Sequence, residues 1–336
     1  MKIWLKSLVV LSWMLFSSAA IAWSCTIATT SSTITPPAIT IQRDLPVGSA
    51  IGSIITTSTI PAFNCTNSAP ALTNQQFGVK GFGTYVMTIN NRRVYSTGVT
   101  GIGYAVFGTS VGNCSGTSGW VDGTANVDGN LNNRILCSAN GRLGYQPIQG
   151  QAGIQFYKTA QTTGSGTVSA QKVAGFILWN DQSSWLTPGS AVNMSAFNVT
   201  TLACTVNNTA ISVPMGTVEK RAFSGVGTWP GDASTKSFSI PLTCNAGTNV
   251  NLQIDGTAQN PTRGVLSLIG GSGSASGVGI QLLYNNNTLS IGNVLPIGTS
   301  TSGNYNILLQ ARYYQTADTV TPGTANAIAT FTLTYQ

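Results

Sequence analysis

Short stretches in which apolar and polar residues alternate recur along the whole chain. This pattern is typical of strands that turn one face to a core and the other to solvent. Clusters of Gly, Asn, Asp and Pro separate the stretches, as turns between strands do. Clear examples are residues 39–41, 85–89, 103–107, 173–179, 238–242, 250–254, 279–284 and 305–313. The pattern predicts an all-β protein built from β-sandwiches.

The first residues have the order of a secretory signal peptide. Two lysines precede an apolar run at 8–16, and an Ala-x-Ala motif ends at Ala22. The apolar run is too short for a membrane-spanning helix. We therefore expect residues 1–22 to be cleaved and the exported chain to begin at Trp23.

The charge content excludes several classes of function. Charged residues make up 7% of the chain, against about 25% in an average protein. The net charge is +7 and the basic residues are scattered, so we expect no nucleic-acid partner. Histidine is absent and Glu219 is the only glutamate, which excludes histidine triads and imidazole metal sites. A carboxylate pair for glycoside hydrolysis would come from the first half, where only Asp122 and Asp128 share a predicted loop. We expect no catalysis, no cofactor and no metal.

The six cysteines follow an export signal, so we expect three disulfides. Several pairings are possible, and the simplest is sequential. Cys25 and Cys65 are 40 residues apart, and so are Cys204 and Cys244. The repeated spacing suggests two related sandwiches, each with an early strand joined to a later one. The sequential pairs are Cys25–Cys65, Cys114–Cys137 and Cys204–Cys244.

A break in the strand pattern divides the chain. Pro188, Gly189 and Ser190 interrupt one strand, and a fresh alternation begins at Phe197. We place the boundary between residues 192 and 193. The expected domains are the signal peptide at 1–22, a first domain at 23–192 and a second domain at 193–336.

The chain ends on an apolar strand. Ala329, Phe331, Leu333 and Tyr335 would share one face of it. This ending, together with Cys204-Thr205-Val206 and the strand at 238–244, resembles the pilin domains of bacterial chaperone–usher fimbriae. The resemblance covers about residues 197–336.

The resemblance implies an immunoglobulin-like sandwich that lacks its last strand. Such a domain has a hydrophobic groove and an open sheet edge. A periplasmic chaperone lends a strand, an outer-membrane usher exports the complex, and an adjacent pilus subunit then donates its own strand. Phe331, Leu333 and Tyr335 would lie beside the groove, and the carboxylate of Gln336 would meet a basic group of the chaperone. A whole domain stands where a donor segment normally precedes the pilin domain, which implies a place at the fimbrium tip.

The first domain resembles fimbrial lectin domains at two points. Its first residue, Trp23, is aromatic, and Asn67 lies two residues after the second cysteine. In the mannose-binding relatives the N-terminus and this loop contact the sugar. The acidic residues and the tyrosine pair that complete their pocket are not matched here, since Ser68-Ala69-Pro70-Ala71 follows.

The loop between Cys114 and Cys137 is a second candidate. It offers an aromatic platform and planar amide or carboxylate groups, which sugars require, and a disulfide would hold it in place. A solvated surface turn and a calcium loop are alternative interpretations, and Trp185 we interpret as packing in the core or between the domains. The candidate ligand-binding residues are Trp23, Asn67, Trp120, Asp122, Asn126, Asp128 and Asn133.

These observations favour a fimbrial tip adhesin whose first domain binds host glycans or glycoproteins. The second hypothesis is a structural tip or adaptor subunit whose first domain binds a host or matrix protein. In both cases we expect export through the periplasm to the cell surface.

Overall fold

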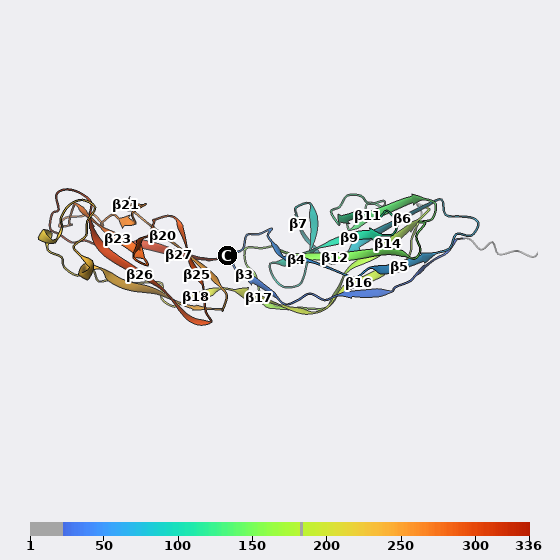
Figure 1. The fold of residues 1–336 in the computed structure, drawn as a ribbon, viewed down its shortest axis with the longest axis horizontal. Coiled ribbons are helices and arrows are strands. Elements are labelled where there is room, and N and C mark those ends of the chain that lie inside the picture. The colour runs from blue at the N-terminus through green and yellow to red at the C-terminus, as the bar shows by residue number, and fades with distance from the viewer. Residues whose placement is uncertain (1–22, 182–183) are drawn as a thin grey trace, which may run out of the picture.

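The computed structural model describes residues 23–181 and 184–336 and shows two β-sandwiches placed end to end (Figure 1). The all-β fold class is confirmed. Within the described ranges the only helical elements are two short 3-10 turns, η1 (Lys220–Ala222) and η2 (Asp232–Ser234). None of the described residues form a helix with the length and apolarity needed to cross a membrane. The expected signal peptide lies outside the described residues.

The first domain is a sandwich of two main sheets. Its larger sheet has eight strands in the order β1-β5-β12-β9-β8-β7, with β10 beside β9 and β4 beside β12. The facing sheet has six strands in the order β11-β6-β14-β16-β2, with β15 beside β14. The strands of the larger sheet are β1 (Cys25–Ile27), β4 (Ala50–Thr56), β5 (Ile60–Cys65), β7 (Tyr85–Ile89), β8 (Arg92–Ser96), β9 (Ile102–Val111), β10 (Ser118–Trp120) and β12 (Ile148–Lys158). Those of the facing sheet are β2 (Ser31–Ile34), β6 (Asn74–Gly81), β11 (Asn133–Asn140), β14 (Gln171–Asn180), β15 (Ser184–Trp185) and β16 (Ser190–Met194).

The core of the first domain lies between these sheets. Phe77 from β6 stacks on Phe176 from β14 with ring centroids 5.2 Å apart, and Phe63 from β5 meets Phe77 edge-on at 6.3 Å. All three rings are fully buried. Burial of apolar surface from both sheets is the main force that holds the two layers together.

A small third sheet joins the first domain to the second. It contains β13 (Gly166–Val168), β17 (Phe197–Leu202) and β3 (Ile39–Gln42) in that order. β17 runs parallel to β3 and buries Phe197 and Val199 in the core of the first domain. The chain therefore stays with the first domain up to Leu202, ten residues beyond the boundary expected at 192/193.

The second domain has its own core between two sheets. The larger sheet has seven strands, ordered β18-β19-β26-β23-β22-β21 with β24 beside β23, and the smaller is ordered β25-β20-β27. In β26, Ile307 and Leu309 are buried while Leu308 between them is 66% exposed, as the two-residue repeat of a half-buried strand requires. The strands are β18 (Cys204–Val206), β19 (Lys236–Cys244), β20 (Asn249–Gly256), β21 (Ala258–Asn260), β22 (Val265–Leu266), β23 (Val278–Tyr284), β24 (Asn287–Thr288), β25 (Val294–Thr299), β26 (Gly303–Gln315) and β27 (Ala329–Tyr335).

Three disulfides are present, as the cysteine count predicts. Cys25–Cys65 joins β1 to β5, and Cys204–Cys244 joins β18 to β19 in the second domain. Cys114–Cys137 ties the loop after β9 to β11. The two domains thus have one feature in common. In each, a disulfide between cysteines 40 residues apart joins an early strand to its antiparallel neighbour.

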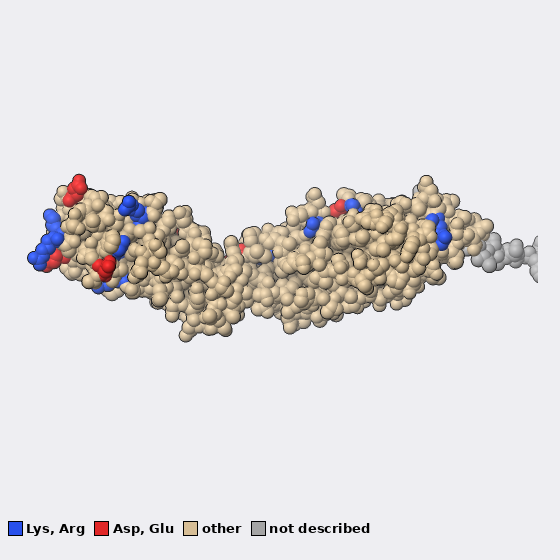
Figure 2. Space-filling model, in the orientation of Figure 1, with Lys and Arg blue, Asp and Glu red and all other residues tan. Residues whose placement is uncertain are grey.

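Charged side chains are sparse over most of the face that Figure 2 shows. Several gather at the free end of the second domain, and a few lie on the first domain (Figure 2). The C-terminus lies at the junction between the two domains (Figure 1).

Candidate functional site

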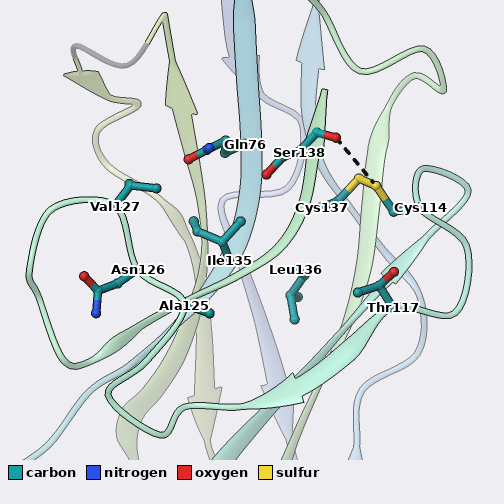
Figure 3. Close-up of a pocket in the computed structure, with 10 residues that line it drawn as sticks. All are labelled: Gln76, Cys114, Thr117, Ala125, Asn126, Val127, Ile135, Leu136, Cys137 and Ser138. Atoms are coloured by element: carbon teal, nitrogen blue, oxygen red, sulfur yellow. Dashed lines mark hydrogen bonds between the residues drawn. A yellow bond between two sulfur atoms is a disulfide. The ribbon is translucent and has the colours of Figure 1, made fainter. Parts of the chain in front are cut away.

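A pocket of about 370 Å³ lies beside the Cys114–Cys137 disulfide of the first domain. Figure 3 shows the side chains that surround it, which come from β6, from β11, from the loop between β9 and β10 and from the loop before β11. Its walls combine apolar groups such as Val127 and Ile135 with the polar side chains of Gln76 and Asn126. This size suits a small ligand, since ligand pockets span roughly 300–1,000 Å³.

Hydrogen bonds within the loop hold its shape. The Asn126 amide accepts from the N–H of Gly129 at 2.9 Å and donates to the carbonyl of Gly123 at 3.3 Å. The Asn133 amide donates to both carboxylate oxygens of Asp128, at 3.2 and 3.1 Å. The structure therefore brings Asn126, Asp128 and Asn133 together around one loop.

The two loop carboxylates are occupied by partners of their own chain. Asp122 accepts from Arg134 at 2.7 Å and from the N–H of Thr124 at 2.8 Å. Burial by itself would raise the pKa of both Asp122 and Asp128. The hydrogen bonds to each carboxylate outweigh burial and hold its pKa below the ordinary value. Both groups are thus charged at neutral pH and shape the loop.

Two residues that the sequence does not mark as part of this site are Gln76 in the pocket lining and Trp185 beside the loop. Gln76 lines the pocket from β6, and its side-chain oxygen is buried without a hydrogen-bond partner in the described structure. Trp185, interpreted above as packing, donates its indole N–H to Asp128 at 3.0 Å and meets Trp179 edge-on at 4.8 Å. Only the sheet pairings β11–β6 and β14–β15 bring these residues near the loop, so no local pattern could have revealed them.

Trp120 does not line this pocket. It lies on β10 opposite Phe107 of β9, with ring centroids 5.0 Å apart. The guanidinium of Arg92 lies 3.9 Å from the centre of its indole ring and also donates a hydrogen bond to the hydroxyl of Tyr157. The aromatic platform expected in the loop is therefore part of a separate cluster on the larger sheet.

Trp23 and Asn67 each lie two residues from a cysteine of the Cys25–Cys65 disulfide, which joins β1 to β5. The N–H of Trp23 donates to Pro70 at 3.5 Å, and the Asn67 side chain accepts from Leu72 at 3.4 Å. These two residues do not line the pocket of Figure 3.

The second domain has a much larger groove of about 1,100 Å³. Phe331, Leu333 and Tyr335 of β27 line one side of it. Its apolar floor comes from core residues such as Ile240 and Leu309. The three aromatic and aliphatic residues expected beside a groove therefore do lie there, whereas Gln336 is exposed beyond the end of β27.

The opposite rim of the groove is an extended segment that belongs to no strand. Ile211, Val213 and Met215 alternate along it and are partly buried against the second core. β27 in turn is paired only with β20 among the described strands. β27 thus has an open backbone edge, and it lines the groove together with the segment at 211–215.

The chain is similar in sequence to known fimbrial proteins. A sequence profile of the family described as fimbrial protein matches residues 191–336. A fimbria adhesin protein of Klebsiella pneumoniae is 30% identical over an alignment of 201 residues that covers 54% of this chain and 59% of that protein. A type-1 fimbrial protein subunit of Serratia marcescens is 36% identical over 136 residues, covering 37% of this chain and 73% of the subunit. The solved receptor-binding domain of the Klebsiella pneumoniae adhesin MrkD1P aligns with a TM-score of 0.37 at 19% identity, over 55% of this chain and 99% of that domain.

The alignment with the Klebsiella adhesin spans less than two thirds of that protein. The alignment with the Serratia subunit spans nearly three quarters of that subunit. Fimbrial proteins are structural components and not enzymes, in agreement with the expected lack of catalysis. The profile match falls on the part of the chain that carries the groove. The chain belongs to the fimbrial protein family.

Proposed function

We propose that this protein is a fimbrial tip adhesin. Its first domain binds a host glycan, and its second domain joins the fimbria by accepting a β-strand from another protein. The observation that carries the proposal is the long apolar groove beside the free edge of β27.

The groove suits an extended peptide better than a compact ligand. An added strand would satisfy the open backbone edge of β27, and alternate side chains would enter the slot. Exposed apolar residues at the slot, such as Ile328 at 73% and Ile269 at 50%, would then be covered. The first occupant is proposed to be a strand of a periplasmic chaperone, which also holds the carboxylate of Gln336. The second is a strand of the adjacent subunit, exchanged at the outer-membrane usher.

The proposed place at the tip rests on the segment that precedes the second domain. A subunit inside the fibre would use such a segment to complete its neighbour. Here residues Phe197–Leu202 are held between β3 and β13 of the first domain, with Phe197 and Val199 in its core. This segment is not free to leave.

The pocket at Cys114–Cys137 is the proposed glycan site. It has apolar walls for the C–H face of a sugar, and the amides of Gln76 and Asn126 can bond to hydroxyl groups. The disulfide and the internal hydrogen bonds of the loop reduce the entropy lost on binding.

Binding of a host or matrix protein is the second candidate. The observation in its favour is the cluster around Trp120, where Arg92 stacks on the indole and Arg93 stacks on Tyr85 at 4.1 Å. Tyr85 is 43% exposed. Trp, Tyr and Arg dominate the binding energy of protein interfaces.

Strand acceptance is tested by titrating the full chain with a synthetic peptide of alternating valine and threonine. A peptide of the same composition with its valines in one block serves as control. We expect binding of the alternating peptide only. Phe331→Asp should weaken it at least ~10-fold, because a buried charge in the slot is unsolvated. Thr332→Asp, on the exposed face of β27, should have little effect, and equal loss in both variants would contradict the proposal.

Ligand class is tested by probing a glycan array and immobilised matrix proteins with the peptide-completed chain. A glycan signal that is lost on Gln76→Ala supports the pocket. A signal confined to matrix protein, lost on Arg92→Ala, supports the second candidate.

A further inference from the structure

The first domain reaches the open edge of β27 at one point. Asp44 donates its backbone N–H to the carbonyl of Tyr335 at 2.9 Å, and the N–H of Tyr335 donates to the Asp44 carboxylate at 2.8 Å. Tyr335 stands opposite Val250 on β20, yet both of its backbone groups bond to Asp44. They therefore point to the side of β27 that lacks a strand.

The two-residue repeat of a strand extends this geometry along β27. Leu333 and Phe331 stand opposite Leu252 and Ile254 of β20, in the same kind of pair as Tyr335 and Val250. Their N–H and C=O groups point to the same open edge. Asp44 thus bonds to the open edge of β27 where a paired strand would bond to Tyr335. The next two backbone positions on the same edge, at Leu333 and Phe331, border the groove.

The contact at Tyr335 is held from both domains. Arg43 forms a two-point ion pair with Asp44, with both N–O distances 2.9 Å, and its guanidinium lies 4.4 Å from the centre of the Tyr335 ring. The Arg43 N–H donates to Leu202 at 3.0 Å, and the Lys158 ammonium donates to the Arg43 carbonyl. Tyr335 is 1% exposed, and its hydroxyl donates to the Cys204 carbonyl at 3.0 Å.

Arg43 is also the one residue of the first domain, among those described, that lines the groove. The walls and floor of the groove therefore come from the second domain. The first domain closes the groove at its Tyr335 end. A bidentate Arg–carboxylate pair is the most geometrically fixed of side-chain ion pairs. The ion pair therefore fixes the position at which the groove ends.

We propose that Arg43 and Asp44 form an end wall that fixes where an incoming strand stops. The inference rests on the proposed function, since it concerns the same groove. The occupant is an extended segment of another protein that pairs with Phe331 and Leu333 and ends, or turns away, before Tyr335. Because the strand repeat is two residues, a stop at one position selects among the registers that place the apolar side chains in the slot. The first domain would thus help select the segment that completes the second.

Hydrogen exchange of single amides in the full chain tests this wall. In the chain without peptide, the Tyr335 amide should exchange at least ~10-fold more slowly than that of Leu333, because only Tyr335 has a partner on the open edge. Asp44→Ala should remove this difference, and Asp44→Asn serves as a second variant of nearly identical shape. Asp122→Ala breaks a comparable Asp–Arg pair inside the first domain and should leave the Tyr335 rate unchanged.

The alternating valine–threonine peptide completes the test. In the wild-type chain it should slow exchange at Leu333 and Phe331 at least ~10-fold and leave Tyr335 as it was. Equal exchange at Tyr335 and Leu333 before the peptide is added, or equal slowing of both by the peptide, would overturn the wall while leaving strand acceptance intact. A peptide that slows none of these amides would overturn strand acceptance, and the wall with it.

Discussion

Tyr335 shows how one side chain can hold the end of the chain in place. Its ring is buried and its hydroxyl bonds to the carbonyl of Cys204 at the start of β18. Burial raises its pKa, and the nearby Arg43 opposes this only in part. The neutral hydroxyl is therefore the form that acts, as a hydrogen-bond donor.

Tyr335→Phe should lower the free energy of unfolding of the second domain by about 1 kcal/mol, since the Cys204 carbonyl loses its buried donor. Tyr284→Phe is the matched control, because the Tyr284 hydroxyl makes only a 3.4 Å contact with Ile297. Urea unfolding measures both. A loss in Tyr335→Phe no larger than in Tyr284→Phe would show that the bond contributes nothing.

Replacing Gln76 should lower the affinity for a glycan and leave the stability of the first domain almost unchanged. Its side-chain oxygen has no partner among the described groups, so Gln76→Ala should cost little stability. If that oxygen meets a glycan hydroxyl, affinity should fall about 10-fold, or about 1.4 kcal/mol. Gln149→Ala on β12, outside the pocket lining, is the control, and equal affinity in the two variants would place the ligand elsewhere.

For single residues, the sequence predicted which residue types lie near the candidate site better than it predicted what each side chain contacts. Asn126 and Asp128 do share a loop, and Asn133 begins the strand that follows it, as their proximity in sequence suggests. The oxygens of Asp128 are nonetheless bonded to Asn133 and Trp185, because a short polar loop satisfies its own groups first. Trp120 faces Arg92 because its strand pairs with β9, and such a pairing has no signature in the residues near it.

Among the elements, β27 was the most predictable. Its alternation marks an exposed and a covered face, and Phe331 and Leu333 line the groove accordingly. β17 has an equally clear alternation, but alternation does not say which core a strand faces. The parallel pairing with β3, more than 150 residues earlier, keeps β17 in the first domain.

The disulfides should differ in what they stabilise. Cys204→Ala with Cys244→Ala releases β18 from β19 and should cost the second domain about 2–5 kcal/mol. Cys114→Ala with Cys137→Ala frees a loop at the surface of the first domain. This second pair should weaken glycan binding through the lost preorganisation and shift the unfolding midpoint less. Calorimetry and glycan titration measure the two effects, and a reversed pattern would contradict the assignment of the loop to the binding site.

At the scale of the whole molecule, the two domains meet where the chain ends (Figure 1). Besides the Asp44–Tyr335 contact, the Gln42 side chain donates to Gly247 at 2.9 Å and accepts from Asn249 at 3.1 Å. These residues lie more than 200 positions apart in sequence. No pattern along the chain could foretell that the end of β3 would meet the end of β27.

The junction should weaken in acid. Burial would raise the pKa of Asp44, but hydrogen bonds from Arg43 and Tyr335 and the nearby charge of Lys158 lower it below its ordinary value. A carboxylate with a lowered pKa stabilises the docked form fully above about pH 4, and the contribution is lost as pH falls through the lowered pKa. Small-angle scattering should show looser domains below about pH 4 in the wild type. Asp44→Asn, which cannot ionise, should change less over the same range, and identical profiles would exclude Asp44 as the acid-sensitive group.

The central claim is that the second domain is completed by a strand from another protein, and thermal unfolding of the full chain with added peptide tests it most directly. A ligand at about 100 times its dissociation constant stabilises a folded domain by about 2.7 kcal/mol. The alternating valine–threonine peptide should therefore raise the unfolding temperature of the second domain in proportion to the logarithm of its concentration, and leave that of the first domain in place. An unfolding temperature that the peptide leaves unchanged, or that the block peptide raises equally, would contradict the account.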